Sequence, residues 1–158
     1  MSGAPGLRSL ALRDRERFDY GDVILVAKPP RTSDDPREWA EAVFSIASIP
    51  PAVRVLFGVR MALAPLLGLR PAPRGVFDVR EVVGDEALMA FDDDHLDFRC
   101  AVGVDAAAAV VRMTTVVRFR NWRGRLYFTP VGLLHPWIVH AMLRRCRRLM
   151  VERGRAER

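Results

Sequence analysis

The sequence predicts an α+β domain in which an antiparallel sheet closes over a long C-terminal helix, with two shorter helices after the first strand. Residues 76–128 alternate apolar and polar side chains between short turn sequences, which is typical of a half-buried antiparallel meander. Residues 136–152 collect apolar side chains on one side of a helix. A chain of 158 residues can bury one hydrophobic core. We therefore expect a single domain over residues 18–152, between a partly mobile basic arm (1–17) and a charged tail (153–158).

The first strand and the two shorter helices are delimited by prolines. Residues 18–28 contain a β-branched run that two consecutive prolines end. A helix start follows: Asp35 can cap it with its carboxylate, and Pro36 suits the first helical turn. A second helix over residues 51–68 is strongly apolar, but Arg54, Arg60 and Pro65 interrupt it at the length of a membrane span, so we expect a buried helix.

Turn sequences divide the meander into five further strands, which makes six in total. We expect these strands over residues 76–83, 87–91, 95–104, 110–120 and 125–129. Because side chains alternate along a strand, one face is apolar in the two longest strands, and the opposite face carries charged residues. The apolar positions are Leu96, Phe98, Cys100, Val102, Val104, Val111, Met113, Thr115, Val117 and Phe119. The sheet is therefore predicted to have one face in the core and one face in water.

The terminal helix is expected over Pro136–Glu152, and its apolar stripe should cover the sheet. At about 100° per residue, the stripe spans about 140°. Its members are Ile138, Val139, Met142, Leu143, Cys146, Leu149 and Met150. The opposite side places Trp137 among arginines.

Charge and cysteine content limit the class of protein only loosely. The formal net charge is +6, and every basic residue except Lys28 is arginine, which by itself is weak evidence for a nucleic-acid partner. Cys100 and Cys146 lack metal-ligand spacing, so we expect two buried free thiols in a reducing compartment. The first residues lack the apolar run of a secretory signal. A cytoplasmic location is therefore expected.

Four segments carry a resemblance to a known group. They are residues 93–99 (DDHLDFR), 113–117 (MTTVV), 124–128 (GRLYF) and 135–145. With the order of elements, they resemble an uncharacterised bacterial family in the START-like (SRPBCC, Bet v 1-like) superfamily, which also contains polyketide cyclases. The resemblance implies a helix-grip fold with a cavity between the sheet and the terminal helix, and it implies no activity. The superfamily usually has seven strands, so the sheet is expected to have six or seven. In that family the domain also occurs behind a Rossmann-type NAD-binding module, but no glycine-rich dinucleotide motif is present here.

Polar groups on the apolar faces are the first candidates for chemistry. Glu81 alternates with Phe77, Val79 and Val83, and a buried carboxylate there could act as a general base or anchor a ligand. The ordinary alternative is exposure at a strand end, or neutralisation by a neighbour such as Arg60. Thr115 is the other polar group on an apolar face.

Tyr127 and His135 are weaker candidates. Tyr127 could reach a cavity mouth only if its strand twists, and otherwise it fills space. His135 stands at the expected helix entrance, where a capping or packing role competes with ligand contact. His95, Asp97 and Arg99 share the polar strand face, where cross-strand pairing with Arg112, Arg118 or Asp78 explains them without chemistry.

No metal site or cofactor is expected. His135 and His140 would point about 140° apart on a helix, so they do not converge on a metal. The acidic run at residues 92–94 lacks the spaced oxygen ligands of a calcium loop and is better explained by a polar hairpin turn. No glycine-flanked serine or phosphate-binding loop is present.

The leading hypothesis is a domain that binds a hydrophobic or amphipathic small molecule between the sheet and the terminal helix. The expected lining is Glu81, Phe98, Met113, Thr115, Val117, Phe128, Ile138 and Met142. The second hypothesis is a cyclase- or isomerase-type enzyme that uses Glu81, Tyr127 or His135 as acid or base in the same cavity. The third is an interaction module whose Trp137 and arginine face touches anionic lipid or nucleic acid. The ordinary alternative to the third is a solvated face with Trp137 covered by the N-terminal arm or by a second subunit of a homodimer.

Overall fold

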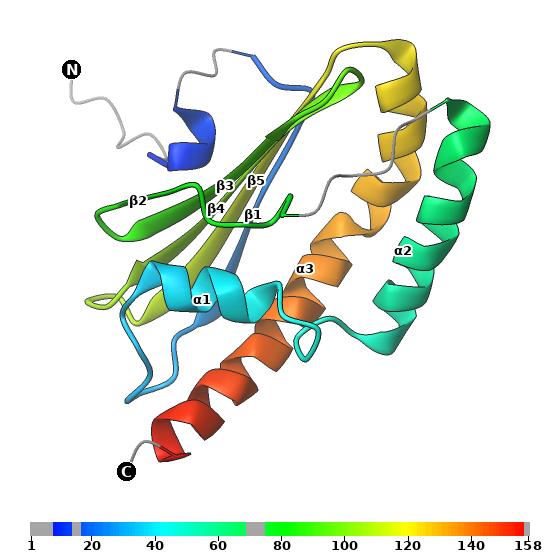
Figure 1. Ribbon diagram of the computed structural model, residues 1–158. Helices are drawn as coiled ribbons and strands as arrows, with labels where there is room; N and C mark the ends of the chain where they lie inside the picture. Colours follow the sequence, from blue (N-terminus) through cyan, green and yellow to red (C-terminus); the bar gives the residue numbers. More distant parts are fainter. Residues whose placement is uncertain (1–7, 14–16, 69–74, 157–158) are drawn as a thin grey trace, which may run out of the picture.

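The chain forms two layers, a five-stranded antiparallel sheet and a set of helices on one of its faces (Figure 1). The structure, a computed structural model, describes residues 8–13, 17–68 and 75–156. The strands are β1 (Tyr20–Ala27), β2 (Glu81–Val83), β3 (Glu86–Asp92), β4 (Leu96–Asp105) and β5 (Val110–Phe119), in the spatial order β1-β5-β4-β3-β2. The helices are α1 (Pro36–Val43), α2 (Pro51–Leu63) and α3 (Trp122–Ala156), with 3-10 turns η1 (Leu10–Leu12) and η2 (Ala64–Leu67). The predicted α+β class and the long C-terminal helix are confirmed.

The predicted strand count is wrong, because residues 125–129 lie in α3 and not in a sixth strand. The helix begins at Trp122 rather than Pro136, since Asn121 caps it: Oδ1 of Asn121 accepts from the Gly124 amide at 3.0 Å. Pro130 and Pro136 lie inside the helix, and α3 changes direction in its first half in Figure 1, as expected where proline removes helical hydrogen bonds. The strand predicted over residues 76–83 shrinks to β2.

The main core lies between the inner face of the sheet and the helices α1 and α3. Its fully buried members come from every layer: Trp39 and Val43 from α1, Leu143 and Cys146 from α3, and Met89, Cys100, Val102 and Val111 from the sheet. The predicted apolar stripe of the terminal helix is confirmed at Val139, Met142, Leu143, Cys146 and Met150, whereas Leu149 is only half-buried. At α1, the Asp35 carboxylate accepts from the Arg37 amide at 2.8 Å, as expected for the cap.

The outer face of the sheet is only partly open to water, which differs from the prediction. Ala11 in η1 is fully buried and packs with Leu88, Ala101 and Val116 in a second, smaller cluster. The Leu10 amide donates to Oε2 of Glu86 at 2.5 Å. Part of the predicted N-terminal arm therefore packs on the sheet, whereas residues 1–7 and 14–16 of that arm lie outside the described residues.

Gly124 is the position where α3 meets the β3–β4 turn most closely. A Cβ at Gly124 would lie 2.1 Å from the His95 carbonyl oxygen, which is backbone and cannot move aside cheaply. We predict that Gly124→Ala lowers the free energy of unfolding by about 3 kcal/mol or more, measured by urea denaturation followed by circular dichroism. Gly58→Ala in α2 is the matched control, because nothing lies within 4 Å of its Cβ position. The control should raise stability by about 0.5–1 kcal/mol, and equal effects of the two substitutions would contradict this account of Gly124.

Candidate functional site

A row of polar side chains crosses the inner face of the sheet beneath α3. In the strand register, Asp22 on β1 is opposite Thr115 on β5, and Thr115 is opposite Cys100 on β4. Residues directly opposite each other in antiparallel strands project on the same side of the sheet. Thr115 and Cys100 are fully buried, and the Asp22 side chain is 13% exposed. A carboxylate, a hydroxyl and a thiol therefore share an otherwise apolar interface.

His135 of α3 reaches down to this row. Its Nδ1 lies 2.7 Å from Oδ2 of Asp22, and the His135 side chain is also 13% exposed. The Tyr20 hydroxyl donates to the same Oδ2 at 2.6 Å and lies 3.4 Å from Nδ1 of His135. The Tyr20 ring packs edge-on against the rings of His135 and Phe128, at centroid distances of 5.6 and 5.0 Å. We call Tyr20, Asp22 and His135 the Asp–His–Tyr cluster.

The hydrogen bonds of the cluster leave one carboxylate oxygen unused. Oδ2 of Asp22 accepts from both partners, which requires a proton on Nδ1 of His135 and turns the second ring nitrogen away from the carboxylate. Oδ1 of Asp22 is buried and has no hydrogen-bond partner among the described residues. An unsatisfied buried acceptor costs about 1–3 kcal/mol, so a donor from a bound molecule would be favoured at this point.

The remaining titratable groups of the interface stay in their neutral forms at neutral pH. Burial, followed by the hydrogen bond to Asp22 and its negative charge, raises the pKa of the Tyr20 hydroxyl, so Tyr20 acts as a donor. Burial also raises the pKa of the Cys100 thiol and raises that of Cys146 to about 12. Both cysteines are free, and as buried thiols they are poor nucleophiles.

This arrangement can position a ligand or transfer a proton. A carboxylate that holds one imidazole nitrogen fixes the ring and its tautomer, which prepares the other nitrogen to accept or donate a proton. A buried pair of this kind also has a purely structural role, because it fixes α3 to β1.

Two of the predicted acid–base candidates lie elsewhere. Glu81 is on β2, pairs with Arg13 and keeps 40% of its side chain exposed. The hydrogen bond from Arg13 lowers the pKa of the Glu81 carboxyl, so Glu81 is ionised and away from the sheet–α3 interface. Tyr127 is half-buried in the second turn of α3 rather than in a strand. Of the three candidates, the structure brings only His135 to the polar row.

The predicted apolar lining divides into two groups. Val117 is opposite both Tyr20 and Phe98 in the register, and Phe128 contacts Tyr20, so these side chains surround the cluster. Met113 and Met142 are buried in the main core, and Ile138 is partly buried at its edge.

A pocket of about 650 Å³ opens beside α1. It is lined by Arg37, Glu41, Phe44 and residues 75–79. The Phe77 ring stacks on Phe44 at 4.5 Å and meets Phe98 edge-on at 6.1 Å, which connects the pocket to the inner face of the sheet.

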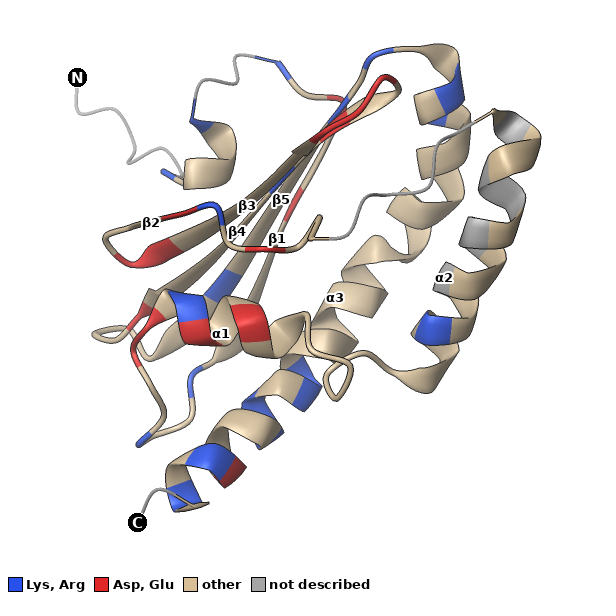
Figure 2. Ribbon diagram, viewed as in Figure 1, with Lys and Arg blue, Asp and Glu red and all other residues tan. Residues whose placement is uncertain are grey.

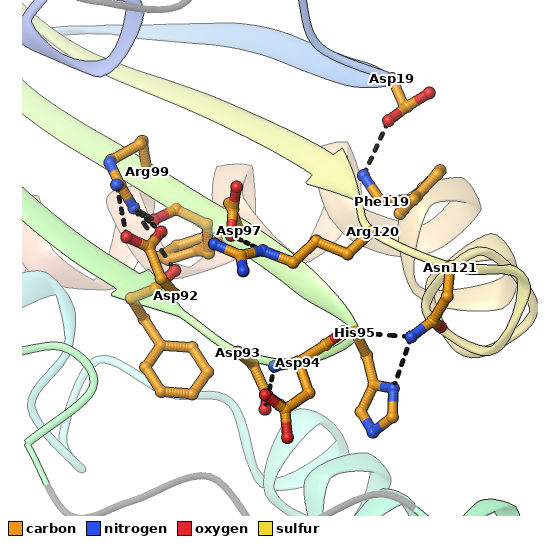
Figure 3. Close-up of polar contacts among 12 residues, drawn as sticks. Asp19, Asp92, Asp93, Asp94, His95, Asp97, Arg99, Phe119, Arg120 and Asn121 are labelled. Carbon is orange, nitrogen blue, oxygen red and sulfur yellow. Dashed lines mark hydrogen bonds and ion pairs between the residues drawn. The ribbon is translucent and has the colours of Figure 1, made fainter.

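The polar triplet of His95, Asp97 and Arg99, at the start of β4, is held by ion pairs and hydrogen bonds, as expected (Figure 3). Nε of Arg120 lies 2.6 Å from Asp97, Arg99 forms a two-pronged pair with Asp92, and Nδ1 of His95 lies 3.0 Å from the Asn121 amide. The acidic run at residues 92–94 forms the β3–β4 turn. Among the described residues, no three His, Cys, Asp or Glu side chains converge as metal ligands.

Tyr20 and Asp22 were missed at the sequence level. The signal was available, because both alternate with the apolar Ile24 and Val26 on the first strand. The reasoning that singled out Glu81 applies equally to Asp22, which is the inward carboxylate of the sheet.

The fold and the site together define a single α+β domain with a buried polar cluster between the sheet and its terminal helix. The family model of proteins of unknown function (DUF2867) matches residues 15–142, and the chain belongs to this family. The match includes all three members of the Asp–His–Tyr cluster. No curated protein and no solved structure matches the chain.

A double-mutant cycle tests the contact between α3 and β1. Asp22→Asn and His135→Gln should each destabilise the protein, because each leaves a buried polar partner unsatisfied. We predict a coupling energy of about 1–3 kcal/mol in urea unfolding at neutral pH. Additive effects of the two substitutions would show that the two side chains do not interact.

Tyr20 should contribute to loss of stability at alkaline pH. Its pKa is raised in the folded state, so above about pH 10 the unfolded chain releases this proton more readily and the free energy of unfolding falls. Tyr20→Phe should reduce the loss of unfolding free energy above about pH 10. The loss that comes from ionisation of the Cys100 and Cys146 thiols, which begins near pH 8.5, should remain. Denaturation curves across this range measure both slopes, and an unchanged slope in Tyr20→Phe would contradict the assignment.

Proposed function

We propose that the protein binds a small amphipathic molecule between the sheet and the N-terminal half of α3. The observation that carries the proposal is the buried, unpaired Oδ1 of Asp22 in an apolar interface. A hydroxyl or amine of a ligand would donate to this oxygen. The apolar part of the ligand would then lie along Phe98, Val117 and Phe128.

The packing of α3 supports a ligand position near its N-terminal half. In the C-terminal half, five side chains from Val139 to Met150 are buried in the main core. Between Trp122 and Ile138, only Gly124 and Phe128 are buried. The sheet–helix contact is therefore tightest beyond the Asp–His–Tyr cluster, and the ligand would occupy the looser side.

The pocket beside α1 borders the proposed ligand position through Phe77. Its wall at Phe77 contacts Phe98, whose strand neighbour Val117 is paired with Tyr20. A volume of about 650 Å³ is in the range of small-molecule sites.

The order of elements supports placing this family, as a bacterial family, in the START-like helix-grip superfamily. A first strand, two helices, an antiparallel meander and a long terminal helix follow one another in the structure. The open sheet has five strands, fewer than the six or seven that the resemblance implied.

A cyclase- or isomerase-type activity in the same place is the second candidate. The contact of Asp22 with Nδ1 of His135 favours it, because a carboxylate-oriented imidazole is a suitable acid or base. In this case His135 would transfer the proton and Asp22 would orient the ring.

Native mass spectrometry of protein purified from its own host tests the proposal. We predict that the wild type retains a small molecule and that Asp22→Asn loses most of it, because the amide changes the charge and acceptor pattern at Oδ1. Asp94→Asn, at an exposed turn residue, is the matched control and should retain the molecule.

Two outcomes separate the hypotheses. Retention by Asp22→Asn equal to that of the wild type would refute the ligand position. If His135→Gln retains a chemically different molecule from the wild type in chromatography of the extracted ligand, the enzyme hypothesis is supported.

A further inference from the structure

The outward side of α3 carries an apolar stripe that ends in arginines. Trp122, Leu126, Leu133, Trp137, Arg144 and Arg148 fall within an arc of about 80° at about 100° per residue. All six are exposed; the exposed fractions of Trp122, Leu133 and Trp137 are 68%, 76% and 82%. We call these six residues the Trp/Arg face. No described segment covers Trp137, and η1 packs on the opposite side of the sheet.

The helix α2, which the sequence predicted to be buried, is mostly exposed and adds apolar surface beside α3. Arg145 donates to the Ala47 carbonyl before α2, and Nη1 of Arg123 lies 3.3 Å from the Cβ position of Gly68 after η2. The residues that flank the α2–η2 segment thus lie near α3, and α2 runs antiparallel beside the first half of α3 (Figure 1). Val55, Val59 and Leu66 on this segment are exposed at 67%, 49% and 79%.

The charge of α2 and of most of α3 has one sign. Residues 51–68 and 122–151 contain arginines and no Asp or Glu, and Glu152 near the end of α3 is the first acidic residue of that helix. In Figure 2, acidic residues gather on α1 and around the strands, whereas the charged residues of α2 and of most of α3 are all basic. Two copies of such a face would repel each other, so its partner must supply negative charge.

Apolar content distinguishes a lipid surface from nucleic acid. Tryptophan and leucine beside arginine match the boundary between acyl chains and anionic headgroups, where tryptophan rings are enriched. A nucleic acid would be matched by hydrogen-bonding side chains instead of an aliphatic stripe. By length and composition α3 resembles a membrane span, but Val139, Met142 and Leu143 are in the core, so the folded helix cannot cross a bilayer. It can lie on one.

We propose that the Trp/Arg face and α2 dock the protein on the surface of an anionic membrane. Trp122, Leu133 and Trp137 insert at the level of the headgroups, and Arg144 and Arg148 contact lipid phosphates. The contact is peripheral and leaves the sheet and the Asp–His–Tyr cluster intact.

Vesicle co-sedimentation tests the docking surface. The wild type should bind vesicles of phosphatidylcholine with phosphatidylserine, bind phosphatidylcholine alone much more weakly, and dissociate as salt rises. Trp122→Ala/Trp137→Ala and Arg144→Gln/Arg148→Gln should each reduce partitioning by about tenfold or more. Leu25→Ala, at an exposed leucine of β1, is the matched control and should bind as the wild type does.

Circular dichroism and melting temperatures should show that the variants are folded, because the changed residues are exposed. Absence of binding to phosphatidylserine vesicles at low salt would overturn the proposal, as would wild-type binding by the tryptophan variant. Tighter binding to an oligonucleotide than to vesicles, or a dimer that the tryptophan variant dissociates, would also overturn it.

Discussion

The apolar contact between the inner face of the sheet and residues 139–150 of α3 determines the rest of the structure. It buries Val139, Met142, Leu143, Cys146 and Met150 against the strands. A buried valine, leucine or methionine side chain contributes about 1.5–3 kcal/mol, which exceeds the net contribution of a typical hydrogen bond between neutral groups. Because this contact sets the rotation of α3 about its axis, it also decides what the first half of the helix presents inward and outward.

Both functional proposals follow from that rotation. His135 is seven residues before Met142, two helical turns away on the buried side, and therefore meets Asp22. Trp137 is two residues after His135 and faces away from the sheet, with 82% of its surface exposed. One helix thus carries a polar group into the interface with the sheet and an aromatic group to the outside. The two sides can act independently, since the docking surface shares no side chain with the cluster.

The Asp–His–Tyr cluster places polar groups in an otherwise apolar interface. Buried polar groups seldom add stability relative to apolar packing, and an unpaired Oδ1 adds a further cost. The main core and the second cluster around Ala11 supply the stability that allows this arrangement. A polar group retained under such conditions is more readily explained by a ligand or a reaction than by folding alone.

The sequence by itself determined the periodic features: the inward face of β4 and β5, the Asp35 cap of α1 and the apolar stripe of α3. Apolar side chains recur every two residues along a strand and about every 3.6 residues along a helix. This periodicity reveals which side of an element is buried, because apolar side chains are removed from water. Only the tertiary structure decided which elements meet. The five residues 125–129 are too few to distinguish a strand from a helical turn, so the Asn121 cap settled their state. Asp22 meets His135 across 113 positions, and Glu81 meets Arg13 across 68, through pairings that local pattern does not encode.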